Sequence, residues 1–197
     1  SDIIPNKNKN YRIEANCPNY PAVFANTFIP DDIDIYDINI DTLSNEEQIG
    51  FSFRFMDDIN FNNYYRLKLF SKCSKEWTNE DGEIQTHNYT AGYQQFMSND
   101  PSFPSNGIPW EGYTFWGRRV LFSDALFNGE EKNIRLDIMI DGFEYEDCDT
   151  ISLQFSVFSS DTYSYYNSVA NHREKGPIGI FGGEVIPVYS NVQNGLG

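Results

Sequence analysis

The sequence predicts an all-β fold, either an antiparallel β-sandwich or a partly closed barrel, with one short C-terminal helix. Three observations lead to this prediction. Apolar and polar residues alternate in several segments, as they do in strands with one buried face. Turn-forming Asn, Asp, Gly and Pro residues separate these segments. Apolar residues at helical spacing follow only after about residue 160.

Residues 116–140 contain two alternating arms joined by a polar segment. The first arm is WGRRVLF, and the second places four apolar side chains on one face: Ile134, Leu136, Ile138 and Ile140. Between them, Asn128-Gly129 offers the positive φ angles of a tight reversal. We therefore expect a long β-hairpin in the middle of an antiparallel sheet. Residues 123–132 carry oxygen ligands and a glycine, so an ion-binding loop is an alternative, but a turn in which Asp124 accepts backbone N–H bonds is the simpler interpretation.

A second hairpin is predicted from residues 50–70. The motif GFSFRF alternates three phenylalanines with polar residues, and YYRLKLF resumes the alternation after a turn-rich stretch at 57–63. Residues 72–88 are polar and contain Asp81-Gly82, which indicates an exposed loop or an edge hairpin. His87 lies there without a neighbouring His or Cys, so we expect a structural or solvent-facing role.

The first 31 residues are predicted to belong to a separate domain. Two short strands, YRIEA and VFANTFI, are followed by the break Pro30-Asp31-Asp32. An unaided hairpin is marginal in water, so we assign residues 1–31 to the end of a preceding domain and residues 32–197 to the main β domain. In residues 33–40, Ile alternates with Asp and the register slips near Tyr36, which predicts a β-bulge. A solvated strand face explains these aspartates better than a calcium site, because no D-x-D-x-D-G loop is present.

Residues 89–113 are rich in aromatic residues, Pro and Asn, which predicts an irregular loop. Such a loop either covers the core or offers a stacking platform for a ligand such as a sugar ring. Three aromatic side chains are the candidate ligand-binding residues: Trp110, Tyr113 and Trp116.

The last sixty residues predict a strand, a helix and a tail. An acidic segment carrying Glu144 and Asp149 precedes the strand ISLQFSV. Ser160 or Asp161 is a candidate cap for a short helix that reaches about residue 172 and packs on the sheet. The Gly-rich tail after it is predicted to be loop-like.

Composition excludes several classes of function. With 14 Lys and Arg against 29 Asp and Glu, the net charge is −15, which disfavours nucleic-acid and anionic-lipid binding. No apolar run reaches the length of about 18 residues that spans a membrane, and the first ten residues do not resemble a signal peptide. We therefore expect either a cytoplasmic protein or an exported chain that lacks its signal.

Catalytic and metal-binding motifs are not found. The sequence has no GxSxG, HExxH, P-loop or GxGxxG motif, and its two histidines are far apart. Its three cysteines form no CxxC pair, so each is expected to be a small buried residue, although one pair could be oxidised in an exported protein. We predict no catalytic residue, no metal and no cofactor.

Seven segments, in this order and spacing, resemble one family: NYRIEA, NTFIP, FNNYYRLKLF, SNDPSF, VLFSDALFNGEEKNIRL, ISLQFSVFSSDTYSYYNSV and YSNVQNGLG. The chain resembles domain-of-unknown-function family 4249, a group of Bacteroidetes cell-envelope lipoproteins. The resemblance implies an N-terminal immunoglobulin-like domain, of which residues 1–31 would be the last hairpin. It also implies a lipid-anchored cysteine upstream of Ser1, distinct from Cys17, and an extracytoplasmic, outer-membrane location.

The resemblance also implies a function. Such proteins are associated with outer-membrane TonB-dependent transporters, which suggests a non-catalytic accessory component that binds a peptide, glycan or other nutrient. A purely structural envelope protein is the second hypothesis. A hydrolase of glycan or peptide that uses acids such as Glu144 and Asp149 is the third, and it requires two facing carboxylates about 5 to 10 Å apart.

Overall fold

The computed structural model describes residues 4–42, 48–106, 112–139, 148–175 and 187–195. The chain divides into two compact units, residues 33–156 and residues 1–32 with 157–197. The predicted fold class is confirmed, because antiparallel strands dominate and a helix follows them in the C-terminal part. Among the described residues, no helix has the length and apolar character needed to cross a membrane.

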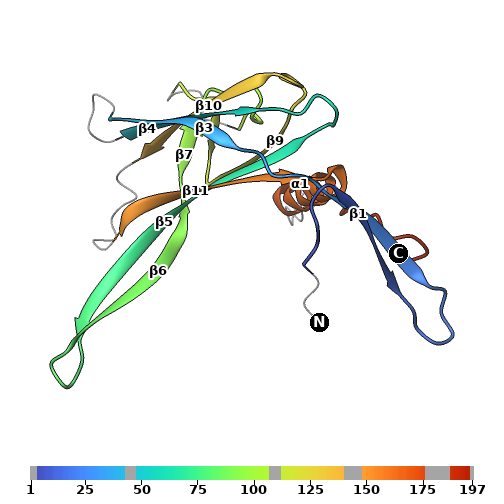
Figure 1. Cartoon of the computed structure of the whole chain (residues 1–197), viewed down its shortest axis with the longest axis horizontal. Coiled ribbons are helices and arrows are strands. Elements are labelled where there is room, and N and C mark those ends of the chain that lie inside the picture. The colour runs from blue at the N-terminus through green and yellow to red at the C-terminus, as the bar shows by residue number, and fades with distance from the viewer. Residues whose placement is uncertain (1–3, 43–47, 107–111, 140–147, 176–186, 196–197) are drawn as a thin grey trace. The chain divides into compact units, whose positions relative to one another are not determined.

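The larger unit is built from two antiparallel sheets (Figure 1). The first sheet has five strands, in the order β3 (Ile35–Thr42), β4 (Gln48–Met56), β10 (Glu131–Met139), β7 (Phe96–Ser98) and β8 (Phe115–Gly117). The second has the order β11 (Cys148–Phe158), β5 (Tyr64–Thr78) and β6 (Ile84–Gln94), with β9 (Arg119–Ser123) also paired to β5.

Aromatic side chains from both sheets meet in the core. Phe53 and Phe55 on β4 are fully buried, as is Tyr65 on β5. The ring of Phe155 on β11 stacks on Tyr65 at 5.4 Å and lies 4.9 Å from that of Phe55. The alternation seen in the sequence therefore predicts the buried faces of β4 and β5 correctly. Each such ring contributes roughly 2–3 kcal/mol through the apolar area it buries.

The hairpins predicted for residues 116–140 and 50–70 are wrong in their pairing. Strand β9 pairs with β5, whereas β10 pairs with β4 along its whole length, from Glu131↔Met56 to Met139↔Gln48. Likewise β4 and β5 belong to different sheets. Residues 57–63 and 124–130 are therefore connections that cross from one sheet to the other. Alternation fixes which side of a strand is buried, but it does not say whether the next strand lies beside it or opposite it.

Two buried aspartates hold these two crossing connections together. The carboxylate of Asp57 accepts hydrogen bonds from the Tyr65 hydroxyl and, at 2.8 Å, from the Gly129 N–H. The carboxylate of Asp124 accepts the Asn63 N–H at 2.5 Å. Burial raises the pKa of Asp124, and that of Tyr65 is raised by burial and by its bond to Asp57. The turn interpretation of residues 123–132 is thus confirmed, and the described residues contain no group of acids, His and Cys suited to a metal ion.

Within the connection 124–130, a side chain added at Gly129 should lower the free energy of unfolding most. Its φ is +75°, and a Cβ atom there would lie 2.7 Å from Ile59 Cβ. Gly82 has a similar φ of +82° but open space around it. We expect Gly82→Ala to lower the free energy of unfolding by about 1–2 kcal/mol through backbone strain. Gly129→Ala should cost at least about 1 kcal/mol more, because it adds steric overlap. Urea unfolding of the two variants measures the difference, and equal losses would contradict the packing described.

The predictions for the sheet edges and for residues 89–113 are confirmed in part. A bulge is confirmed in β3, where the register shifts between Tyr36 and Asn39. The edge hairpin is confirmed as the arm of β5 and β6, which projects from the sheet in Figure 1. On it, exposed His87 stacks on Tyr89 at 5.9 Å. The irregular loop predicted for 89–113 is wrong over β6 and β7, because these residues find sheet partners that local composition does not reveal.

The smaller unit combines the two ends of the chain. Strands β1 (Lys9–Ala15) and β2 (Val23–Ile29) form an antiparallel pair. Residues of the C-terminal tail lie along β2, where Phe24 and Gln193 exchange backbone hydrogen bonds of 3.3 and 2.8 Å. The hairpin therefore gains a partner that the sequence analysis did not anticipate. The tail belongs to the same unit as residues 1–32, whereas the predicted boundary places it with the main β domain.

Helix α1 (Ser160–Lys175) completes the smaller unit. Its N-terminus is capped by Ser159, whose hydroxyl accepts the Thr162 N–H at 3.2 Å. This cap lies just before the predicted caps, Ser160 or Asp161. The immunoglobulin-like identity expected for residues 1–31 stays a prediction.

Candidate ligand-binding site

The smaller unit contains an open hollow of about 740 Å³ lined by exposed tyrosines. We call it the tyrosine hollow. Its walls are helix α1, strands β1 and β2, and the C-terminal tail. Six large apolar or aromatic side chains line it: Ile13, Tyr165, Tyr166, Val188, Tyr189 and Val192.

Tyr165 and Tyr166 come from the second turn of helix α1. Their ring centroids are 5.5 Å apart, with planes at 69°. Phe158 stacks on Tyr166 at 5.5 Å and supports that ring. Because neighbouring helix residues point about 100° apart, the two tyrosines present differently oriented faces to the hollow.

Tyr189 is tied to the same helix from the tail. Its backbone N–H donates to the Ser168 hydroxyl oxygen at 2.8 Å, and its own hydroxyl donates to Asp161. Asn191 donates its side-chain amide to the other carboxylate oxygen of Asp161 at 3.2 Å. The hydrogen bond to Asp161 raises the pKa of the Tyr189 hydroxyl above its ordinary value. The described part of the tail, residues 187–195, forms no helix or strand, yet it holds an aromatic ring in a fixed place.

These side chains remain accessible although they are held in position. Tyr165 is 47% exposed, Tyr166 39% and Tyr189 37%, and Ile13 at the rim reaches 69%. Adjacent exposed aromatic and aliphatic groups are typical of binding surfaces, since each exposes apolar area that a ligand removes from water. Tyrosine adds a polar hydroxyl and has few side-chain torsions to restrict. The arrangement is suited to binding a ring or an apolar side chain.

Of the three residues predicted to bind ligand, Tyr113 and Trp116 are described, and neither lines the tyrosine hollow. Trp110 falls outside the described residues. Tyr113 donates its hydroxyl to Asp137 at 2.8 Å. The half-buried Trp116 is part of β8, and its backbone N–H donates to Asn106 at 3.0 Å. Neither residue lines the tyrosine hollow or the two hollows beside the disulfide.

The sequence does not predict the tyrosine hollow, because its walls on β1 and β2 lie more than 130 residues before those on α1 and the tail, from Thr27 to Asp161. The sequence predicts a helix that packs on the sheet and a loop-like tail, and neither prediction brings Tyr166 and Tyr189 together. The run Tyr163-Ser-Tyr-Tyr was the available signal. Tyrosines on adjacent helix positions cannot all point into one core.

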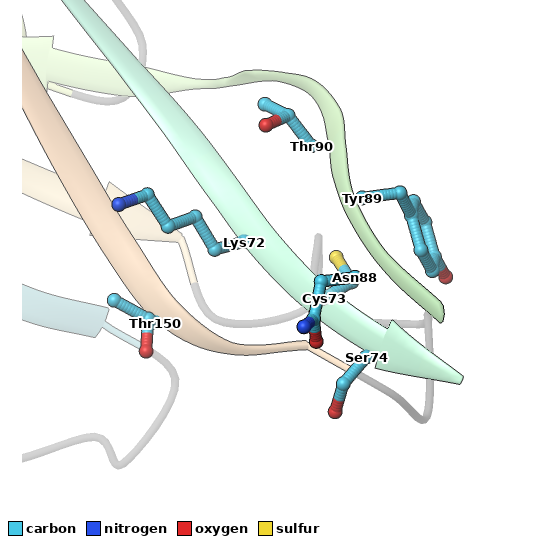
Figure 2. Close-up of a pocket in the computed structure, with 7 residues that line it drawn as sticks. All are labelled: Lys72, Cys73, Ser74, Asn88, Tyr89, Thr90 and Thr150. Atoms are coloured by element: carbon cyan, nitrogen blue, oxygen red, sulfur yellow. The ribbon is translucent and has the colours of Figure 1, made fainter. Parts of the chain in front are cut away.

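Two further hollows flank the disulfide region of the larger unit. One, of about 430 Å³, is polar and is lined by side chains from β5, β6 and β11, including Lys72, Thr90 and Thr150 (Figure 2). The other, of about 350 Å³, lies between the two sheets and has mainly apolar walls. Thr150 borders both hollows.

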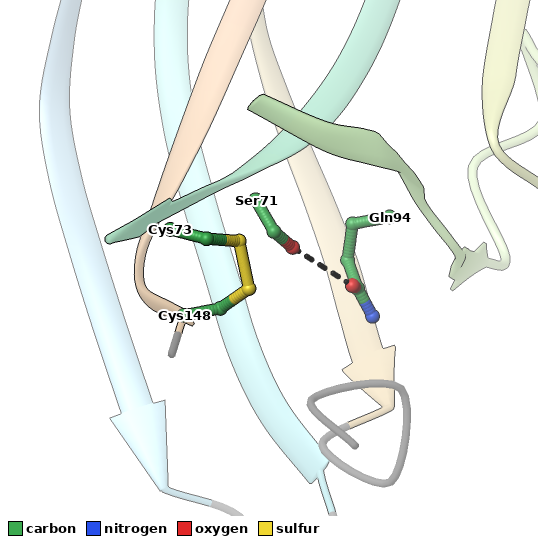
Figure 3. Close-up of a disulfide and its surroundings, with 4 residues drawn as sticks. All are labelled: Ser71, Cys73, Gln94 and Cys148. Carbon is green, nitrogen blue, oxygen red and sulfur yellow. Dashed lines mark hydrogen bonds between the residues drawn. A yellow bond between two sulfur atoms is a disulfide. The ribbon is translucent and has the colours of Figure 1, made fainter. Parts of the chain in front are cut away.

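Cys73 and Cys148 form a disulfide that ties β5 to the beginning of β11 (Figure 3). Close by, the buried Ser71 hydroxyl donates to Gln94 at 3.2 Å. The oxidised pair left open by the sequence is therefore present. The expectation that every cysteine is buried is wrong for Cys17, which is exposed and free. Its neighbours Asn16, Pro18 and Asn19 favour an exposed turn, where no core is available.

Comparison with known proteins shows that the chain belongs to one protein family. The sequence model described as "Domain of unknown function (DUF4249)" matches residues 1–197. No curated protein and no solved structure matches the chain significantly.

Proposed function

Because the chain belongs to the DUF4249 family over its whole length, a family without an assigned activity, we propose a function from its surface. We propose that the protein is a non-catalytic, extracytoplasmic binding component of a TonB-dependent nutrient uptake system. In its full-length form it would be lipid-anchored at the outer membrane. Its ligand would be a glycan or a peptide bound at the tyrosine hollow.

The tyrosine hollow is the observation that carries this proposal. Its three tyrosines have accessible faces, and Tyr189 is fixed at both its backbone and its hydroxyl. Preorganised aromatic side chains reduce the entropy lost on binding. Sugar rings and apolar peptide side chains both present flat or convex apolar faces that fit against such rings.

The disulfide supports the proposed location. Disulfides persist in oxidising compartments and are rare in the cytosol. The Cys73–Cys148 pair joins positions 75 residues apart, within the larger unit. The net charge of −15 agrees with an accessory that reaches its partner through specific contacts and not through general attraction to anionic lipid.

Affinity purification from native membranes tests the proposed partnership. We expect the tagged, full-length protein to bring down a TonB-dependent transporter in stoichiometric amount, identified by mass spectrometry. The matched control is the same purification with the tag on an unrelated lipoprotein of the same membrane. Recovery of the protein alone in several mild detergents would contradict the transporter link.

A further inference from the structure

Strand β3 is an edge strand of the larger unit, and on its free side no described strand pairs with it. It is the last strand of its sheet, and in the described part of the chain its only strand partner is β4. After the bulge its pairing is regular, from Asn39↔Ser52 to Thr42↔Ile49. Two of its three isoleucines are exposed, Ile38 at 53% and Ile40 at 70%. An edge of this kind offers unpaired backbone donors and acceptors to another strand.

An apolar cleft opens beside this edge. It is the hollow of about 350 Å³ between the two sheets, and we call it the apolar cleft. Strands from both sheets contribute its apolar lining: Ile40, Ile49, Phe51, Leu69, Ile138, Ile151 and Leu153. Leu69 and Ile138 are almost completely buried, so they form its floor. The cleft thus lies between β3 and β11, which are the edge strands of the two sheets.

The walls of the apolar cleft are fixed on the side of the second sheet. The disulfide of Cys148 with Cys73 ties the start of β11 to β5. Thr150 and Ile151, which line the cleft, follow Cys148 by two and three residues. A cleft with a covalently held wall keeps its shape without an occupant, which lowers the cost of binding one.

The charges along β3 identify the kind of strand that fits. Asp34 and Asp41 are exposed, and neither has a cationic partner among the described residues. Asp37, at the bulge, forms an ion pair with Arg54 at 3.7 Å. Acidic side chains and a bulge on an edge strand discourage pairing with an identical edge, because like charges would then face each other. The same charges favour a strand that carries Lys or Arg.

We propose that β3 accepts an extended segment of a partner protein as an additional strand. The segment pairs with residues 39–42, inserts apolar side chains at alternate positions into the apolar cleft, and places Lys or Arg near Asp34 and Asp41. Main-chain hydrogen bonds supply affinity and the cleft supplies specificity, as in other cases of strand addition. This surface belongs to the larger unit, so the inference does not depend on ligand binding at the tyrosine hollow.

Synthetic peptides test the inference on the intact chain. The probe is a seven-residue peptide that alternates Lys and Val, and its matched control alternates Glu and Val. We expect the cationic peptide to bind at least about tenfold more tightly, measured by fluorescence anisotropy of a labelled peptide. Two N-methylated versions, each blocking the N–H groups of alternate residues, separate strand pairing from charge attraction. Alternate N–H groups of a strand point to opposite edges, so one version should lose binding about tenfold or more and the other should retain it.

Two exposed isoleucines provide matched variants. Ile40→Ser removes a side chain from the apolar cleft, whereas Ile84→Ser changes an equally exposed isoleucine, at 71%, on the β5–β6 arm. We expect the first to weaken peptide binding about fivefold or more and the second to leave it unchanged. Equal binding of both N-methylated peptides, or no effect of Ile40→Ser, would overturn the inference. A concentration-dependent dimer that Ile40→Ser dissociates would also overturn it, since the cleft would then hold a second copy.

Discussion

Breaking the Cys73–Cys148 disulfide is expected to lower the free energy of unfolding by about 4 kcal/mol. The bond closes a loop across a separation of 75 residues, and the chain-entropy estimate for such a loop gives this value. Cys148→Ser is the better variant, because Cys73 is almost fully buried and Cys148 only in part. Urea unfolding of the variant and of the wild type, with and without reductant, measures the loss.

The remaining cysteine provides the control for this prediction. Cys17 is exposed and unpaired, so Cys17→Ser should change the unfolding free energy by no more than about 0.5 kcal/mol. Reductant should destabilise this variant as much as it destabilises the wild type. If reductant left the wild-type unfolding curve unchanged, the disulfide would not be formed in solution and the argument for an oxidising compartment would fail.

Replacing Asp57 is expected to lower the free energy of unfolding by about as much as breaking the Cys73–Cys148 disulfide. The side chain of Asp57 is 4% exposed, and Asp57→Ala leaves the buried Tyr65 hydroxyl and the Gly129 N–H without their acceptor. Each unsatisfied buried donor costs about 1–3 kcal/mol, so we expect a total loss of about 4 kcal/mol. Because Gly129 lies in one crossing connection and Tyr65 follows the other, the two connections should loosen together. Hydrogen exchange of the amides in residues 57–65 and 124–130 reports that loosening.

Asp58 is the matched control, since it is the next acidic residue in the same turn. Its carboxylate accepts only exposed hydrogen bonds among those described, from the Asn60 backbone and side chain at 2.9 and 2.7 Å. Asp58→Ala should therefore cost about 1 kcal/mol. Equal losses for Asp57→Ala and Asp58→Ala would show that the buried carboxylate does not organise the crossing.

The faces of the strands could be predicted from the sequence because burial leaves a period of two. Val120 and Phe122 on β9, and Ile134, Leu136 and Ile138 on β10, are buried as their spacing indicates. The resemblance to the family was also sufficient to identify it, because it rested on ordered segments along the whole chain.

Strand partners could not be predicted, because they depend on contacts between distant segments. The turn residues at 128–129 suit a tight hairpin and a crossing between sheets equally well. The crossing is stabilised by a hydrogen bond from the Gly129 N–H to Asp57, which lies 72 residues earlier. The tyrosine hollow could not be predicted for the same reason. Its walls at Ile13, Tyr165 and Tyr189 come together only when the tail pairs with β2. No local pattern records that pairing.

Ligand binding at the tyrosine hollow is the central claim, and a thermal-shift titration with glycan and peptide collections tests it most directly. A ligand that binds the native state raises the melting temperature by mass action. We predict that a ligand stabilising the wild type has no effect on Tyr165→Ala or Tyr189→Ala. It should still stabilise Tyr20→Ala, which removes a 62% exposed tyrosine outside the hollow. Equal stabilisation of the wild type and both hollow variants would contradict the claim.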